Sequence, residues 1–158
     1  MPEKEAVWLR GFDEIHIKGS DTHELVRAIR EKTRGDDPIT LFPDPAGGHR
    51  DTRSGTTDIE IFEQEGFKDM RYRTKIMSVR DCLNAANAFL AKGRAKLDAE
   101  KCKNTIIDFE QCSMKPGTTQ LNKTDLNRTH FVDGFKNMID YEFPVGGIVG
   151  GWKEVNIR

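Results

Sequence analysis

Acidic side chains are the residues of this sequence best placed to do chemistry, and Asp44 comes first among them. Asp44 follows the short apolar run 39–42, ITLF, which suits a buried strand that ends at Pro43. Ligands of open α/β sheets bind beyond the carboxyl ends of the strands, so a functional carboxylate is expected here. The glycines of FPDPAGG let a substrate come close to the backbone. An Asp-Pro turn without further function is the alternative.

A second acid lies on the last predicted helix. At 100° per residue, three polar residues of this helix point to within about 80° of His130: Asp133, Asn137 and Asp140. The aromatic and aliphatic residues lie roughly opposite, so Asp133 flanks the buried face and is predicted to project across the end of the sheet toward Asp44. A polar stripe on the outer surface explains the same spacing. His130 could orient a water or a ligand, although a lone helical histidine is more often structural.

A third acid comes from the first predicted strand, which carries Asp13 and Glu14. Alternation along a strand puts these two on opposite faces, so only one of them can share a site with Asp44. Two or three converging carboxylates would bind Mg²⁺ or Mn²⁺, which prefer oxygen ligands. Two such ions about 3.5–4 Å apart can activate water and stabilise the leaving oxygen in phosphodiester cleavage.

Composition excludes several other classes of protein. The 158 residues fit one domain, 36% of them are hydrophobic and 32% are charged. No apolar run approaches the length of about 18 residues that a membrane span needs, and the N-terminus does not resemble a secretory signal. The three cysteines lack a CxxC spacing and indicate reduced thiols. There is no P-loop, GxSxG, HExxH or GxGxxG motif.

The charges are unevenly distributed although the net charge is −1. Residues 1–60 carry an excess of acidic side chains, and residues 61–104 carry an excess of basic ones. A phosphate-binding edge beside a carboxylate-rich cation site would have this pattern, and so would an ordinary solvated surface.

Periodicity and capping signals predict alternating strands and helices. Strands are expected at 6–17, 39–42, 69–76 and 94–98, and helices at about 21–34, 57–65, 78–93, 102–112 and 127–141. The third helix carries an apolar stripe of Val79, Leu83, Ala86 and Leu90. This alternation favours an α/β fold with a mostly parallel sheet covered by helices.

Three segments resemble, in order, the nuclease domain of the phage terminase large subunit, the motor that packages viral DNA. They are LFPDPAGGHRDTRSGTTDIEIFEQEGF, VRDCLNAANAFLAKGRAKLD and RTHFVDGFKNMIDYEFPV. The first is similar to the family's PD-x-[AS]-G turn with the T-[ST]-D-I helix after it. The last is similar to a closing helix of the form H-x-x-D-A-x-x-Y. The resemblance covers about residues 1–145 and leaves a glycine-rich tail at 146–158.

The resemblance implies an RNase H-like fold, a mixed sheet flanked by helices, and endonuclease chemistry on double-stranded DNA with two metal ions, Mg²⁺ or Mn²⁺. Asp44 matches the family's second-strand acid, Asp133 matches the acid on the last helix, and Glu14 matches a nearby strand acid. The family's first catalytic aspartate and its ATPase domain have no match. We therefore expect a partial terminase domain, from a split gene, a relic or a fragment.

Two groups of basic residues are expected to contact the DNA backbone. His49, Arg50 and Arg53 lie on a glycine-flanked loop next to Asp44. Arg71, Arg73 and Lys75 alternate along one predicted strand, so they share a face that is expected to be exposed. An ordinary polar sheet face is the alternative for this second group.

The implied partners are double-stranded DNA, the terminase ATPase domain or the remainder of the large subunit, the small subunit and the portal protein, in the cytoplasm of an infected bacterial host. The alternative function is a catalytically incomplete remnant that binds DNA or the portal. A different RNase H-like nuclease, such as a junction resolvase or a transposase core, is a more distant alternative because a second basic arm is lacking.

Overall fold

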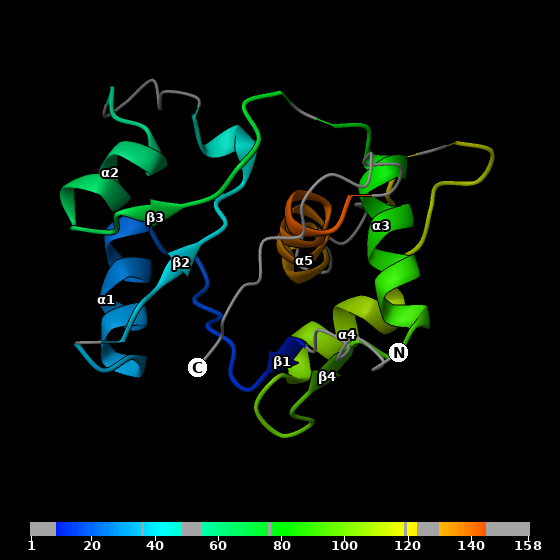
Figure 1. The fold of residues 1–158 in the computed structure, drawn as a ribbon, viewed down its shortest axis with the longest axis horizontal. Coiled ribbons are helices and arrows are strands. Elements are labelled where there is room, and N and C mark those ends of the chain that lie inside the picture. The colour runs from blue at the N-terminus through cyan, green and yellow to red at the C-terminus, as the bar shows by residue number, and fades with distance from the viewer. Residues whose placement is uncertain are drawn as a thin grey trace, which may run out of the picture.

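The computed structural model describes residues 9–35, 37–48, 55–75, 77–118, 120–122 and 130–144. Helices and short strands alternate along the chain (Figure 1), which agrees with an α/β fold. The predicted tail, 146–158, lies outside the described residues. The elements are β1 (Leu9–Gly11), α1 (Thr22–Lys32), β2 (Thr40–Leu41), the 3-10 turn η1 (Pro45–Gly48), α2 (Asp58–Gln64), β3 (Asp69–Met70), α3 (Val79–Ala91), β4 (Ala95–Leu97), α4 (Lys103–Gln111) and α5 (His130–Glu142).

The strands form two parallel pairs. β1 pairs with β4 in the register Leu9–Ala95, and β2 pairs with β3 in the register Thr40–Asp69. Parallel pairing follows the prediction, but among the described residues each sheet has only two strands. The strand expected at 69–76 is reduced to β3, because the chain leaves its partner after Met70.

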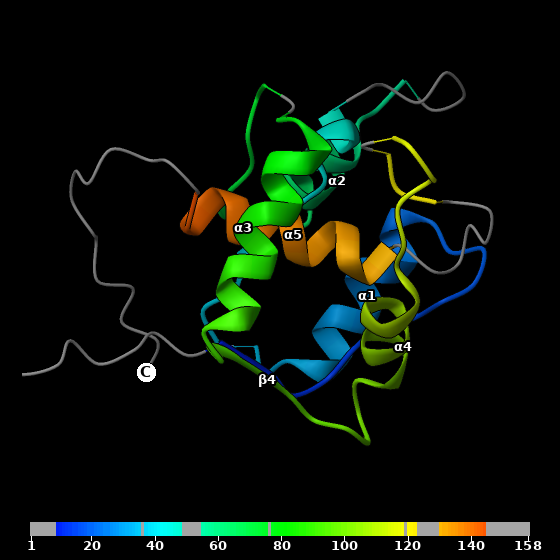
Figure 2. The same cartoon turned by 90° about the vertical axis from the view of Figure 1, so that its right-hand side faces the viewer.

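Each strand pair belongs to its own hydrophobic cluster. Val26 of α1 packs with Phe62 of α2 and with Phe67 beside the β2–β3 pair. Beside the β1–β4 pair, Ala85 and Phe89 of α3 pack with Ile139 of α5, which is fully buried. α5 lies between the two groups of elements in Figure 1. It packs against α3 and against α4, which contacts its N-terminal end (Figure 2).

Polar caps fix where the helices begin. Asp21 caps α1 by accepting a hydrogen bond from the Glu24 backbone N–H, 2.8 Å away. Thr57 and Glu60 form a complete capping box at α2. Ser78 accepts from the Asp81 N–H at the start of α3. These local signals explain why the helix starts agree with the sequence prediction.

The buried face of α3 differs from the predicted stripe. Val79 is 38% exposed and Leu90 is 36% exposed, so the ends of that stripe face outward. The buried positions are instead Cys82, Ala85, Ala86 and Phe89. Ala85 and Phe89 of this face pack with Ile139 of α5, so the contact with α5 determines which face of α3 is buried.

Candidate active site

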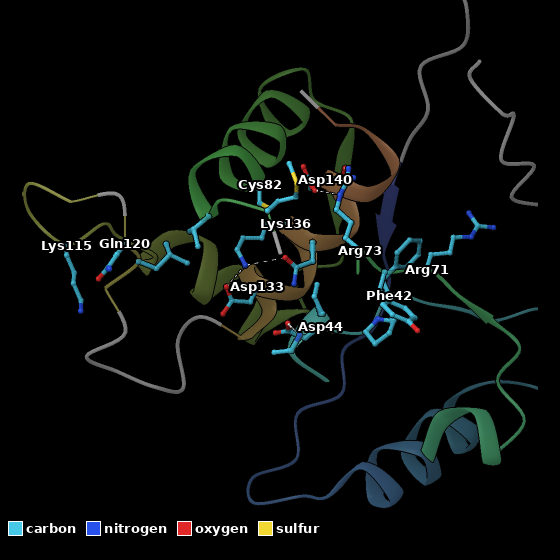
Figure 3. A pocket seen from close by; sticks show the side chains of 18 residues that line it. Phe42, Asp44, Arg71, Arg73, Cys82, Lys115, Gln120, Asp133, Lys136 and Asp140 are labelled. Atoms are coloured by element: carbon cyan, nitrogen blue, oxygen red, sulfur yellow. Dashed lines mark hydrogen bonds and ion pairs between the residues drawn. The ribbon is translucent and has the colours of Figure 1, made fainter. Parts of the chain in front are cut away.

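A cavity of about 420 Å³ lies where the β2 side of the molecule meets α3 and α5. Its walls come from five regions: the turn after β2, the segment after β3, the first part of α3, one face of α5, and residues 115 and 120–121 of the loop after α4. Both acids of the predicted pair, Asp44 and Asp133, line it (Figure 3). The structure therefore brings together two carboxylates that lie far apart in the sequence.

Asp44 is placed by the turn that ends β2. Its Oδ1 accepts a hydrogen bond from the Ala46 backbone N–H, 2.9 Å away. This side chain–backbone turn orients the carboxylate at the start of η1. Among the described residues the Asp44 carboxylate has no further hydrogen-bond partner. Since Asp44 is also exposed, it can accept a ligand from the cavity.

Asp133 lies in the first turn of α5 and is held by a lysine one turn along the same helix. The Lys136 Nζ lies 2.6 Å from the Asp133 Oδ1, and the lysine side chain is only 8% exposed. A second contact joins Nζ to the Asn137 Oδ1 at 3.4 Å. Figure 3 shows the Lys136 side chain directed along the cavity wall toward Asp133. The helix therefore places a positive charge directly beside the proposed catalytic acid.

The last acid of the stripe, Asp140, is buried against an arginine. The Arg73 Nε lies 2.6 Å from the Asp140 Oδ2, and the Arg73 Nη2 donates to the Asp140 backbone oxygen at 2.7 Å. Only 5% of the Asp140 side chain is exposed. Because Asp133, Asn137 and Asp140 all line the cavity, the polar stripe of α5 faces inward rather than toward solvent.

Glu14 has a different place from the one predicted, at the N-terminus of α4 and not among the residues that line the cavity. Its carboxylate accepts four hydrogen bonds of 2.7–2.9 Å, from the backbone N–H and side chain of both Asn104 and Thr105. Burial alone raises the pKa of Glu14, but these hydrogen bonds outweigh it and hold the pKa below its ordinary value. Glu14 therefore caps a helix whose own N-cap residue, Cys102, makes no side-chain cap.

The predicted exposed basic face is only partly exposed. The Arg71 Nη1 lies 2.9 Å from the Glu142 Oε1, and Arg73 pairs with Asp140, so α5 carboxylates neutralise both guanidinium groups. Each arginine side chain is about one-third exposed, whereas Lys75 is exposed. Both arginines line the cavity. Arg71 also pairs with the nearby Asp69, at 3.2 Å. The alternation of the basic residues carries no signal for their acidic partners on α5, which lie about 70 residues further on.

The remaining predicted site residues lie at or beyond the limits of the described structure. His130 is exposed and is the first residue of α5, and it does not line the cavity. The predicted DNA-contacting residues His49, Arg50 and Arg53 lie outside the described residues. Their role stays a prediction.

The fit of a divalent metal ion can be judged from the ligands in place. In the described parts of the chain no three His, Cys, Asp or Glu residues form a group able to hold a metal ion. Three described carboxylates line the cavity, and two of them are engaged by cations: Asp133 by Lys136 and Asp140 by Arg73, beside Asp44. The described residues therefore do not complete a divalent metal site by themselves.

Two residues of this cavity were missed from the sequence. Lys136 carries an obvious signal, because Asp133 and Lys136 are three apart on one helix, a spacing that brings opposite charges together. Cys82 lines the cavity from α3, and burial together with the nearby Asp140 carboxylate raises the pKa of its thiol. No spacing in the sequence pointed to Cys82.

Comparisons with known protein families, with curated proteins and with solved structures give no match. Within the described residues no helix has the length and apolar character needed to cross a membrane.

Proposed function

We propose that this chain is the nuclease domain of a viral DNA-packaging terminase, an endonuclease that cleaves concatemeric double-stranded DNA with the help of Mg²⁺ or Mn²⁺. The observation that carries the proposal is the meeting of Asp44 and Asp133 at one cavity. Such metal ions activate water and stabilise the leaving oxygen of a phosphodiester when they are bound. Asp44 and Asp133 are the residues of this chain that would contribute carboxylates to them.

The arrangement of the elements supports the proposed RNase H-like fold at a coarse level. Two parallel strand pairs are flanked by helices, and Asp44 follows the carboxyl end of β2. Asp133 comes from α5, which packs against α3 and α4. Within this proposal the family's first catalytic aspartate, which has no match here, comes from the ATPase-linked part of the large subunit. The small subunit and the portal protein complete the packaging machinery in the host cytoplasm.

Cationic side chains near the cavity would contact the phosphates along the proposed path of the DNA. Lys75 and Lys115 are exposed, and Lys115 lines the cavity. Arg71 and Arg73 also line the cavity. Lysine and arginine contacts to phosphates give binding that does not depend on base sequence and weakens with salt.

A nicking assay on supercoiled plasmid tests the proposed activity. With Mn²⁺, the chain alone should nick slightly or not at all, and nicking should appear when a fragment that supplies the missing strand and its aspartate is added. Asp44→Asn and Asp133→Asn should each abolish that nicking. Glu110→Gln removes an exposed carboxylate of α4 outside the cavity and should leave it unchanged. Cleavage that survives Asp133→Asn would show that the site lies on other residues.

A second candidate is a catalytically incomplete module that binds DNA or the portal. It is favoured by the pairing of Asp133 with Lys136 and of Asp140 with Arg73, which leaves Asp44 as the cavity carboxylate without a protein cation among the described residues. Plasmid binding that is unaffected by Asp44→Asn, without Mn²⁺-dependent nicking even when the fragment with the missing aspartate is added, would select this candidate over the endonuclease.

A further inference from the structure

Lys136 is a buried ammonium in the wall of the cavity. It is nine-tenths buried, and its Nζ contacts the Asp133 Oδ1 at 2.6 Å and the Asn137 Oδ1 at 3.4 Å. Both partners lie on the same helix, within one turn of Lys136. A lysine is rarely buried unless an opposite charge accompanies it, because removal of an ammonium from water is costly. The Asp133 carboxylate therefore accounts for the burial of Lys136.

Of the other two acids that line the cavity, one is paired with a cation and one is not. Asp140, the next acid on this face of α5, is paired with Arg73 at 2.6 Å. Among the described residues, Asp44 faces the cavity without a cationic partner. A cation that enters the cavity from solvent therefore meets one available carboxylate, Asp44, and one whose Oδ1 is already bound to an ammonium.

We propose that Lys136 is the internal counter-ion of Asp133 and competes with divalent cations for it. The ammonium and a metal ion would share the Asp133 Oδ1, and two cations at one oxygen repel each other. A divalent ion would be bound by Asp44 and Asp133 only with Lys136 turned away. The flexible four-carbon stem of lysine allows this without refolding of α5. The inference rests on the proposed function, since it takes Asp133 as a metal-binding acid, and it makes Lys136 a positioning residue.

Mn²⁺ affinity of the full chain, measured from the electron paramagnetic resonance of free Mn²⁺, tests this competition. Lys136→Met keeps the length of the side chain and removes its charge, and should tighten Mn²⁺ binding roughly tenfold or more. Lys136→Arg keeps the charge and should stay within about twofold of the wild type. Lys115→Met removes another cavity lysine, one that is exposed, and controls for the general loss of a positive charge. Asp133→Asn added to Lys136→Met should reverse the gain.

The outcomes separate this inference from the proposed function. Equal Mn²⁺ affinity in the wild type and Lys136→Met, with both weakened by Asp133→Asn, overturns the competition and leaves the metal site in place. An equal gain in Lys115→Met also overturns it. If Asp133→Asn does not weaken Mn²⁺ binding in any of these proteins, both proposals are overturned.

A measurement on the wild-type protein covers the case in which Lys136→Met does not fold. The ¹⁵N resonance of the buried Lys136 ammonium, assigned by its disappearance in Lys136→Arg, should shift as Mg²⁺ is added. NaCl added to the same ionic strength should not move it. A Lys136 resonance that stays in place while Mg²⁺ perturbs the Asp133 backbone amide would contradict the displacement.

Discussion

The Arg73 guanidinium lies 2.6 Å from the Asp140 carboxylate and also donates to the backbone oxygen of Asp140 at 2.7 Å. These two hydrogen bonds tie the segment after β3 to the last helix. The ion pair between Arg71 and Glu142, at 2.9 Å, lies beside them. Since Arg73 and Asp140 both line the cavity, the pair joins two of its walls.

Arg73→Met should destabilise the protein by about 2–4 kcal/mol, because it leaves the nearly buried Asp140 carboxylate without its cation. The expected loss is below that for a fully buried pair, since one-third of the Arg73 side chain is exposed. The free energy of unfolding in urea measures the loss. Lys75→Met, two residues on and exposed, should change it by less than about 0.5 kcal/mol. Equal effects of the two substitutions would show that the Arg73 pair contributes little.

Glu14→Gln should lower the free energy of unfolding by about 1–2 kcal/mol at neutral pH, because a charged cap at the N-terminus of α4 is replaced by a neutral one. The pKa of Glu14 lies below its ordinary value of 4.5 in the folded protein. Its stabilisation is therefore present above pH 4.5 and is lost as the pH falls through the folded-state pKa.

Urea unfolding of wild type and Glu14→Gln over a series of pH values checks this expectation. The difference between the two proteins should narrow progressively below pH 4.5. Glu110→Gln changes an exposed position of α4, the helix that Glu14 caps. It is the matched control and should follow the wild type. A pH-independent difference would mean that Glu14 acts through packing rather than through its charge.

Two glycines should respond to alanine in opposite directions. Gly134 lies in α5 with no atom within 4 Å of an added Cβ, so Gly134→Ala should raise the unfolding free energy by about 0.5–1 kcal/mol. At Gly11 an added Cβ would clash with the Leu97 Cδ2, in the β1–β4 pair. Gly11→Ala should cost about 1–3 kcal/mol because Leu97 must move. Thermal unfolding of both variants is the measurement. A Gly11→Ala variant more stable than the wild type would show that the β1–β4 pair packs more loosely than the structure indicates.

Local features of the sequence predicted the local structure well. Asp21, Thr57 and Ser78 each begin a helix, because a cap needs only its own side chain and the next turn. Gly66 and Gly93 end helices with positive φ values of 89° and 64°. The position of Asp44 at the end of β2 followed from the same kind of reasoning.

Features that depend on tertiary contacts were predicted less well. The stripe of Val79 and Leu90 is as apolar as the buried face of α3, so periodicity alone could not choose between them. Alternation of Arg71 and Arg73 predicts a shared face but says nothing of the acids that α5 brings against it. Glu14 looked like a strand acid because its partners, at the start of α4, lie far along the sequence.

Arg50→Ala combined with Arg53→Ala should weaken binding to duplex DNA and flatten its salt dependence, by about one unit of slope for each phosphate that these arginines neutralise. The physical reason is that each neutralised phosphate releases a counter-ion from the DNA. Titrations of a labelled duplex at several NaCl concentrations give the slope. Lys18→Ala, an exposed basic position outside the cavity, serves as the control. An unchanged slope would show that this loop does not contact the DNA backbone.

If Asp44 and Asp133 form one cation-binding site, the anomalous scattering of Mn²⁺ in crystals soaked with MnCl₂ tests it most directly. We expect an anomalous peak between the two carboxylates, with the Lys136 ammonium turned away from the Asp133 Oδ1, and no peak there in Asp133→Asn crystals. Strong anomalous peaks elsewhere on the protein, with none between Asp44 and Asp133 and with Lys136 still on Asp133, would contradict a shared site.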